Sequence, residues 1–233
     1  MMNTVIFSIA MMLATPSQPL RSAELDIQAI KQHLMAIDRA YPNKYVMNLK
    51  DWGIRPVTNL RFLSSLAYHR IYYYRLSTCL RCGVAVIAID DNYQVSNIQD
   101  VAAFNAMLRT EDIAVNSILD AENLAYDFLM CKSLRAPLGE EKQTLGLDII
   151  KSANEIKFVT DSERAREAPM LDRTLGIRPP KLDVHDEIYS LIVYSWSWYS
   201  GNIARHTVVI LPNLKLDYEY AGLADEVGDF GEY

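Results

Sequence analysis

The C-terminal third of the chain constrains the fold more than any other stretch. Between residues 187 and 222, three runs rich in β-branched and aromatic residues are separated only by the dipeptides "GN" and "PN": "EIYSLIVYSWSWYS", "IARHTVVIL" and "LKLDYEYAG". Runs of this composition favour strands, and two-residue connections between them favour tight hairpin turns. The sequence therefore predicts a three-stranded antiparallel meander at the end of the fold.

Alternation along the first of these runs places two tryptophans on one strand face. Ile192, Tyr194, Trp196 and Trp198 point one way, and Ser195 points the other. Two interpretations follow. The face is either a flat platform on which a ligand ring could stack, or the core-facing side of the sheet, since aromatic strand residues dominate core burial. We expect the core-facing side and keep Trp196 and Trp198 as candidate ligand-binding residues.

Helices are predicted upstream of the meander. Ser22 has the character of an N-cap, and apolar residues then recur at helical spacing until "YPN" at 41–43 ends the pattern. A second helical region runs from Val101 to Cys131, and Thr110 divides it into a pair of helices. The stretch 60–78 is ambiguous, because its apolar spacing suits a helix and its aromatic density suits a strand. We predict a helix there.

Short strands and a long loop complete the expected fold. The run "GVAVIAI" at 83–89 predicts a buried strand, and "DDNYQV" predicts a turn into a second one. Residues 161–184 combine high charge with Pro169 and Gly176, which predicts a long surface loop and a candidate lid or partner contact. The whole order predicts an α+β fold, with helices packed on one face of an antiparallel sheet that ends in the meander.

The chain ends suggest an exported, single-domain protein. Residues 1–23 resemble a signal peptide, because the apolar run Val5–Ala14 is too short to span a bilayer and small residues follow it. Its start carries only the α-amine as positive charge, so an N-terminal membrane anchor is the alternative. We predict a secreted or periplasmic protein without a transmembrane span, with one domain at 24–216 and an acidic tail at 217–233.

Charge is polarised along the chain. Residues 41–89 contain seven bases and one acid, whereas residues 90–233 contain 13 bases and 25 acids. The basic segment includes "YHRIYYYR", which makes Arg70, Tyr73 and Arg75 candidate ligand-binding residues for an anion. The alternative, which we favour, is that these bases pair with acidic elements of the same chain. A chain of net acidic charge repels phosphate, so we expect no nucleic-acid partner.

Two cysteines frame the motif "CLRCG" at Cys79 and Cys82. A thioredoxin-like motif needs a helix after it and haem attachment needs a histidine after the second cysteine, but Gly83 and a strand follow here. The motif is either a short disulfide, which an exported chain permits, or half of a structural zinc site with Cys131 and a histidine. We predict the disulfide, with Cys131 buried or paired with one of the other two, and no cofactor; structural zinc is the alternative.

Catalytic motifs are sparse. The chain has no GxSxG, P-loop, HExxH or dinucleotide fingerprint. "LDVHDE" places His185 beside Asp186, and with His206 on a nearby predicted strand they could form a metal or acid–base site, the alternative being a solvated turn. Two functions follow: a non-enzymatic protein that binds a protein partner or a small ligand, which we prefer, and a metal-assisted hydrolase. The sequence does not define the oligomeric state.

Overall fold

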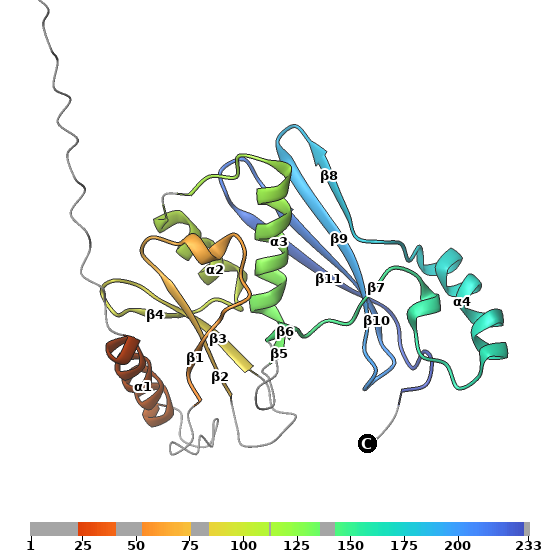
Figure 1. Cartoon of the computed structure of the whole chain (residues 1–233), viewed down its shortest axis with the longest axis horizontal. Coiled ribbons are helices and arrows are strands. Elements are labelled where there is room, and N and C mark those ends of the chain that lie inside the picture. Colours follow the sequence, from red (N-terminus) through yellow and green to blue (C-terminus); the bar gives the residue numbers. More distant parts are fainter. Residues whose placement is uncertain (1–22, 41–52, 76–83, 112, 136–142, 231–233) are drawn as a thin grey trace, which may run out of the picture.

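The computed structural model describes residues 23–40, 53–75, 84–111, 113–135 and 143–230 (Figure 1). The helices are α1 (Ala23–Ala40), α2 (Val101–Thr110), α3 (Ile118–Lys132) and α4 (Asp161–Leu175), with 3₁₀ turns η2 (Leu63–Ser65) and η3 (Ala153–Glu155). The strands are β1 (Arg55–Pro56), β2 (Arg70–Arg75), β3 (Val84–Ile89), β4 (Val95–Asn97), β5 (Leu134–Arg135), β6 (Thr144–Leu145), β7 (Ile149–Ile150), β8 (Lys181–His185), β9 (Ile188–Trp196), β10 (Ile203–Ile210) and β11 (Leu216–Ala224). The predicted α+β class is confirmed. Among these residues, no helix is both long and apolar enough to cross a membrane.

Two larger antiparallel sheets organise the described residues, and β5 and β6 form a separate two-stranded antiparallel pair. The N-terminal sheet has the strand order β1-β2-β3-β4, and the C-terminal sheet has the order β11-β10-β9-β7, with β8 also paired to β9. The predicted meander is confirmed as β9, β10 and β11, in which Arg205 lies opposite both Tyr194 and Ala221. The predicted strand at 83–89 is confirmed as β3, and the turn that follows it leads into β4.

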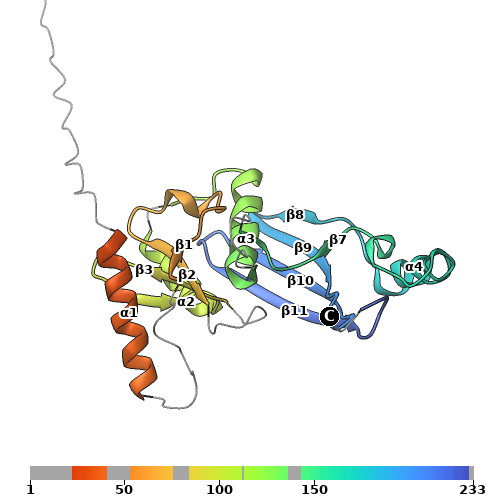
Figure 2. The ribbon, with the colours of Figure 1, turned by 60° about the horizontal axis from the view of Figure 1, so that its bottom comes forward.

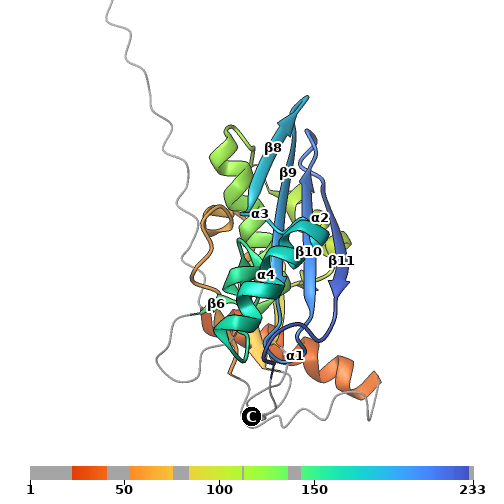
Figure 3. The ribbon, with the colours of Figure 1, turned by 90° about the vertical axis from the view of Figure 1, so that its right-hand side faces the viewer.

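Helices and sheets alternate across the molecule (Figures 1 and 2). The helix α1 packs on one face of the N-terminal sheet through Ile30 and Leu34, which join Tyr72 and Ile87 in one apolar cluster. The helices α2 and α3 lie between the two sheets. The helix α4 covers one end of the far face of the C-terminal sheet, against Tyr194, Trp196 and Ile203 (Figure 3). Helices thus lie on both faces of both sheets, whereas we expected a single sheet covered on one face.

The central helix α3 holds the two sheets together. Its buried side chains include Leu124, Phe128 and Leu129, and they belong to one cluster with Val86 of the N-terminal sheet and Val208 of the C-terminal sheet. A helix that is apolar around most of its circumference is one buried between other elements. The predicted helix pair is confirmed, and α2 ends at Thr110. The expectation that Thr110 caps the second helix is wrong, because α3 begins at Ile118 with Ser117 as its N-cap. The two sheets therefore share one hydrophobic core.

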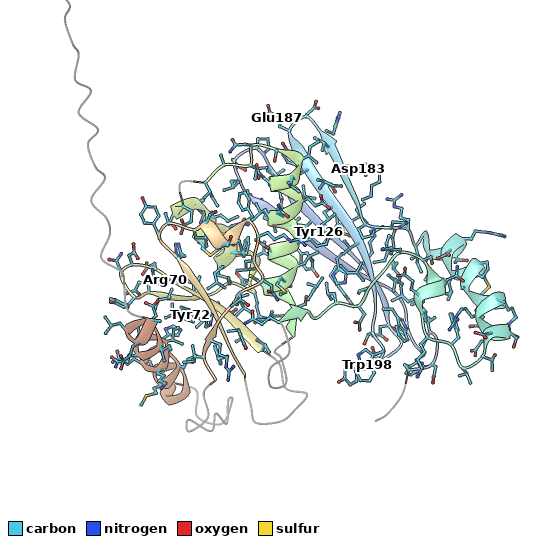
Figure 4. The ribbon with its side chains drawn as sticks, viewed as in Figure 1. Arg70, Tyr72, Tyr126, Asp183, Glu187 and Trp198 are labelled. Carbon is cyan, nitrogen blue, oxygen red and sulfur yellow. The ribbon has the colours of Figure 1, made fainter. Side chains whose placement is uncertain are left out.

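An ion pair fastens α1 to the N-terminal sheet. The carboxylate of Asp26 is fully buried and accepts hydrogen bonds from Arg70 Nε at 2.6 Å and from the hydroxyl of Tyr72 at 2.9 Å. Arg70 also donates to Asp91 at 3.1 Å (Figure 4). A buried carboxylate needs partners of this kind to offset its desolvation. The contact confirms, for Arg70, that a base of the basic segment pairs with acids of the same chain.

The prediction of a helix over 60–78 is wrong. Residues 63–65 form the turn η2 and residues 70–75 form the strand β2. The aromatic run decides the outcome, because Tyr73 faces the shared core while Tyr72 and Tyr74 face α1. In a strand covered on both sides, successive buried side chains point to opposite faces. Counting apolar residues at helical spacing does not detect this arrangement.

The prediction of a surface loop over 161–184 is also wrong. Residues 161–175 form α4, which begins where the hydroxyl of Thr160 accepts a hydrogen bond from the backbone N–H of Glu163 at 3.1 Å. It ends at Gly176, whose φ of +66° is the left-handed conformation that glycine adopts readily at a helix end. Pro169 lies inside the helix on its exposed side, where we had interpreted it as a helix breaker.

Most of the predicted acidic tail is structured. Residues 217–224 belong to β11, and the segment after them returns to the end of the C-terminal sheet. Trp196 Nε1 donates a hydrogen bond to the carbonyl of Val227 at 2.9 Å, and the Lys157 ammonium lies 3.0 Å from Asp229. The acids of this segment are thus placed by strand pairing and specific contacts, which net charge alone does not reveal.

Candidate functional site

A loop between β1 and β2 is anchored by a buried carboxylate of the central helix. Asp127 of α3 accepts hydrogen bonds from the backbone N–H groups of Arg61 at 3.0 Å, Phe62 at 2.7 Å and Leu63 at 2.8 Å. Burial raises the pKa of Asp127, and the three N–H donors offset part of that rise. We call residues 57–69 the anchored loop, because this carboxylate fixes its middle.

A second buried carboxylate holds the end of the same loop. Glu111, at the C-terminal end of α2, accepts hydrogen bonds from the backbone N–H groups of Ala67 at 2.7 Å and Tyr68 at 3.1 Å. Its other contact is His69 Nδ1 at 2.7 Å. Two carboxylates from two core helices therefore determine where this loop lies. The loop includes the 3₁₀ turn η2, and the two carboxylates tie it to the core. Functional residues are often found on loops that a rigid scaffold positions in this way.

Amide side chains close the start of the anchored loop against β6. Gln143 accepts a hydrogen bond from the backbone N–H of Thr58 at 2.9 Å and donates one to the carbonyl of Pro56 at 2.9 Å. The side-chain amide of Asn59 donates to the backbone carbonyl of Gln143 in return. This reciprocal pairing ties the loop to the residue before β6.

An open cleft of about 530 Å³ lies between the anchored loop, α3 and β6. The loop contributes Asn59 and Arg61 to its wall. The helix α3 contributes Glu122, Tyr126, Asp127 and Met130, and the β6 side contributes Gln143 and Leu145. The volume is within the range of pockets that hold small ligands. Six of the eight lining residues carry polar groups, and Met130 and Leu145 supply the apolar part. Tyr126 projects from the middle of α3 (Figure 4).

The charges of the cleft lie on two different walls. Arg61 is exposed on the loop wall, and its Nη1 lies 3.5 Å from Asn123 Oδ1, at the limit of a hydrogen bond. Glu122 is half-buried on the helix wall. Burial raises the pKa of the Tyr126 phenol, Glu122 raises it further and Arg61 lowers it. The phenol therefore lies within the electrostatic reach of both charged groups.

The predicted hydrolase residues are not brought together. His185 is exposed at the end of β8, with Nε2 3.2 Å from the carboxylate of Asp186. His206 is buried on β10 opposite Val193, whereas His185 pairs with Ile188. Five residues of strand separate these positions, or about 16 Å. Within the described ranges, no group of three or more His, Cys, Asp or Glu side chains could hold a metal ion.

His206 belongs instead to a buried chain of hydrogen bonds. Its Nε2 lies 2.9 Å from the hydroxyl of Ser195, and its Nδ1 lies 2.9 Å from the hydroxyl of Tyr218. Burial lowers the pKa of His206 to about 4, so the imidazole is neutral at neutral pH. A serine within reach of a histidine can be a nucleophile and its base. Here both side chains are enclosed between the C-terminal sheet and the central helices, away from the cleft.

The predicted tryptophan pair lies in one apolar cluster at the α4 end of the C-terminal sheet, where Trp198 packs half-buried against the cluster that contains Trp196. Trp196 is buried against the α4 end of the sheet, which is the core-facing interpretation. Trp198 lies in the turn after β9, where its ring stacks on the exposed ring of Tyr199 with centroids 3.8 Å apart (Figure 4). Both tryptophans therefore pack on the apolar cluster under α4, as the core-facing interpretation predicted.

The candidate residues of the basic segment also differ in environment. Tyr73 is buried in the shared core, and Arg70 is held by Asp26 and Asp91. Arg75 ends β2, and its side chain lies outside the described part of the structure. Arg61, which we had counted only as one of the seven bases, is the base of this segment that lines the cleft.

The cysteine predictions fall into two parts. Cys131 is a free, buried cysteine of α3, in agreement with one of its two predicted states, and burial raises the pKa of its thiol. Cys79 and Cys82 lie outside the described residues, so the predicted disulfide and its zinc alternative stay predictions.

No protein-family model matches this chain, and no curated protein or solved structure matches it significantly.

Proposed function

We propose that the protein is a non-enzymatic binding protein and that the cleft between the anchored loop, α3 and β6 holds a small ligand. The observation that carries the proposal is the way in which Asp127 fixes the loop wall. One carboxylate binds three successive backbone N–H groups at 2.7–3.0 Å, and it does so from the central helix of the core. A preformed wall reduces the entropy that ligand binding has to overcome.

The roles of the polar groups support binding rather than catalysis. Asp127 is the buried acid of the cleft, and its oxygens are already occupied by the loop. The groups that face the open space, Arg61, Glu122 and Tyr126, have the character of recognition groups. They present a cation, an anion and a phenol beside the apolar side chains of Met130 and Leu145. A few polar groups on an apolar surface orient a ligand and provide specificity.

A screen of a small-fragment library by saturation-transfer NMR tests the proposal. The full chain is compared with Glu122→Arg, which introduces a large side chain of opposite charge into the cleft wall. Glu187→Arg is the matched control, since Glu187 lies at the tip of the β8–β9 hairpin (Figure 4). We expect ligands that bind the wild type and Glu187→Arg and are lost from Glu122→Arg. Failure to find any ligand that distinguishes the two variants would refute the proposal.

We also propose that the protein acts outside the cytoplasm, after removal of residues 1–23. The support is the apolar run Val5–Ala14, followed by small residues, before α1. The intact mass of the protein purified from its own cells tests this. A mass that lacks the first 23 residues supports export, and a mass that includes the apolar run contradicts cleavage.

A further inference from the structure

The two charged walls of the cleft define the chemistry of a ligand more closely. Arg61 stands on the anchored loop and Glu122 on α3, and among the described residues neither forms an ion pair. Both side chains line the cleft, and Arg61 Nη1 also lies 3.5 Å from Asn123 Oδ1, at the limit of a hydrogen bond. A guanidinium recognises a carboxylate through paired hydrogen bonds, and a glutamate accepts hydrogen bonds from an ammonium group.

Tyr126 connects the two charged groups in space. It lies one helical turn after Glu122 on α3, so these two side chains share a face of the helix, and both line the same cleft as Arg61. The phenol can donate to a carboxylate or accept from an ammonium group. A ligand with only one charge would leave the other wall without a partner.

Two of the side chains that line the cleft are apolar. Met130 is buried and lines the cleft from α3, and Leu145 lines it from β6. Methionine side chains adapt to different apolar shapes because they are unbranched and polarisable. This surface favours a ligand with an aliphatic or aromatic substituent between its charged ends.

Building on the proposed function, we infer that the ligand is a small zwitterion with an apolar side chain. Arg61 binds its carboxylate, Glu122 binds its ammonium group, Tyr126 contacts the polar end, and the side chain lies on Met130 and Leu145. Two sources share this chemistry: a free apolar amino acid, and a short apolar peptide with both termini free. The cleft volume of about 530 Å³ accommodates either.

Isothermal titration calorimetry, which measures the affinity of the full chain for a series of leucine derivatives, tests the inference. The probes are L-leucine, L-leucinamide, N-acetyl-L-leucine and glycine, with leucyl-leucine and its end-blocked forms as the peptide series. We expect loss of either charge, or of the side chain, to weaken binding about tenfold to a hundredfold. The series that binds more tightly identifies the source.

Two charge-removing variants assign each contact to a residue. Arg61→Gln should bind L-leucine and L-leucinamide with equal affinity. It should still bind L-leucine more tightly than N-acetyl-L-leucine. Glu122→Gln should show the reverse pattern. Arg178→Gln and Glu187→Gln are the matched controls, because both residues are exposed on other elements, and both should bind like the wild type.

The outcomes separate this inference from the proposed function. Equal affinity for zwitterionic and blocked probes, or a loss in Arg61→Gln that is the same for acid and amide, would overturn the zwitterion and leave the cleft as a ligand site. If none of the leucine probes binds, but fragments of other charge bind the wild type and not Glu122→Arg, the zwitterion is again refuted and the proposed function stands. If neither probes nor fragments bind, both fail.

Discussion

The strands β3 and β10 lie in neighbouring sheets and differ in how their faces are covered. From Ala85 to Ile89 every residue of β3 is buried, because α1 covers one face of the N-terminal sheet and the helices α2 and α3 cover the other. On β10, burial alternates from His206 to Ile210. One face of the C-terminal sheet packs on the central helices, and α4 covers only one end of its other face (Figure 3).

The difference shows that a sequence pattern reveals the covered faces of one strand and not of the other. The run "VAVIAI" is continuously apolar, as in a strand buried on both sides. In "RHTVVI" three polar residues precede three apolar ones, so its residue types do not show the alternation of burial that the structure has. Both sheets nevertheless depend on the same central helix. The comparison therefore predicts a shared stability and unequal tolerance to substitution.

The largest effect is expected from Phe128→Ala. Phe128 is fully buried on α3, and its ring makes edge contacts with Phe104 at 5.0 Å and Tyr218 at 5.4 Å between centroids. Loss of a buried phenylalanine costs about 3–5 kcal/mol of the free energy of unfolding. Denaturant unfolding, followed by circular dichroism and tryptophan fluorescence, should show one transition at lower denaturant. Two separate transitions would mean that the sheets do not share a core.

The next effect is a pH dependence that originates on the covered face of the C-terminal sheet. His206 has an unfolded pKa near 6.5 and a folded pKa of about 4, so the unfolded chain binds more protons between these values. The contribution of His206 to the free energy of unfolding should be fully present above pH 6.5. It should fall by about 3 kcal/mol as the pH drops from about 6.5 to about 4.

Denaturant unfolding at pH 7 and at pH 4.5 measures this loss. His206→Gln should reduce the difference between the two pH values, because it removes the group that titrates. His185→Gln is the control, since His185 is exposed at the hairpin tip, and it should keep the pH dependence of the wild type. An unchanged difference in His206→Gln would refute the assignment.

Adjacent threonine substitutions compare the two strands directly. Val86→Thr and Ile87→Thr place a hydroxyl on opposite covered faces of β3. Each should lower the free energy of unfolding by about 1–3 kcal/mol. On β10, Val208→Thr should cost as much, whereas Val209→Thr should stay within about 0.5 kcal/mol, because Val209 is only partly buried. Thermal unfolding of the four variants gives the comparison. A large cost at Val209 would show that this face is also covered.

A single-hydroxyl deletion, Tyr218→Phe, should have a modest effect. The substitution removes the hydroxyl that lies 2.9 Å from His206 Nδ1 and keeps the ring that contacts Phe128. We expect a loss of about 1 kcal/mol at pH 7 in the same unfolding assay. Tyr220→Phe, at an exposed position of β11, provides the matched control and should be neutral.

Local patterns were sufficient for much of the fold. The meander, the strand β3 and the helix pair α2–α3 follow from short apolar patterns and turn residues that are contiguous in the chain. The segments that were predicted wrongly depend on other parts of the molecule. The strand character of 70–75 depends on α1 covering Tyr72, and α4 is a helix despite Pro169 because that residue lies on its exposed side.

The cleft could not be predicted from local patterns. Asp127 and the backbone groups that it binds are 64–66 residues apart in the chain, and nothing in the sequence places them together. One signal was present in the sequence: Asp127 interrupts the otherwise apolar run "LAYDFLMC". An acid at a core position of a buried helix requires partners. The partners themselves become known only from the fold.

The free edge of the C-terminal sheet begins with an amide side chain. Asn105 of α2 donates a hydrogen bond to the carbonyl of Leu216 at 2.7 Å and accepts one from its backbone N–H at 2.8 Å. Leu216 is the first residue of β11, the strand at this edge. The amide thus occupies the two groups with which a strand from another molecule would start to pair. Asn105 therefore blocks strand addition at the first position of this edge, because its side chain substitutes for the backbone of an added strand.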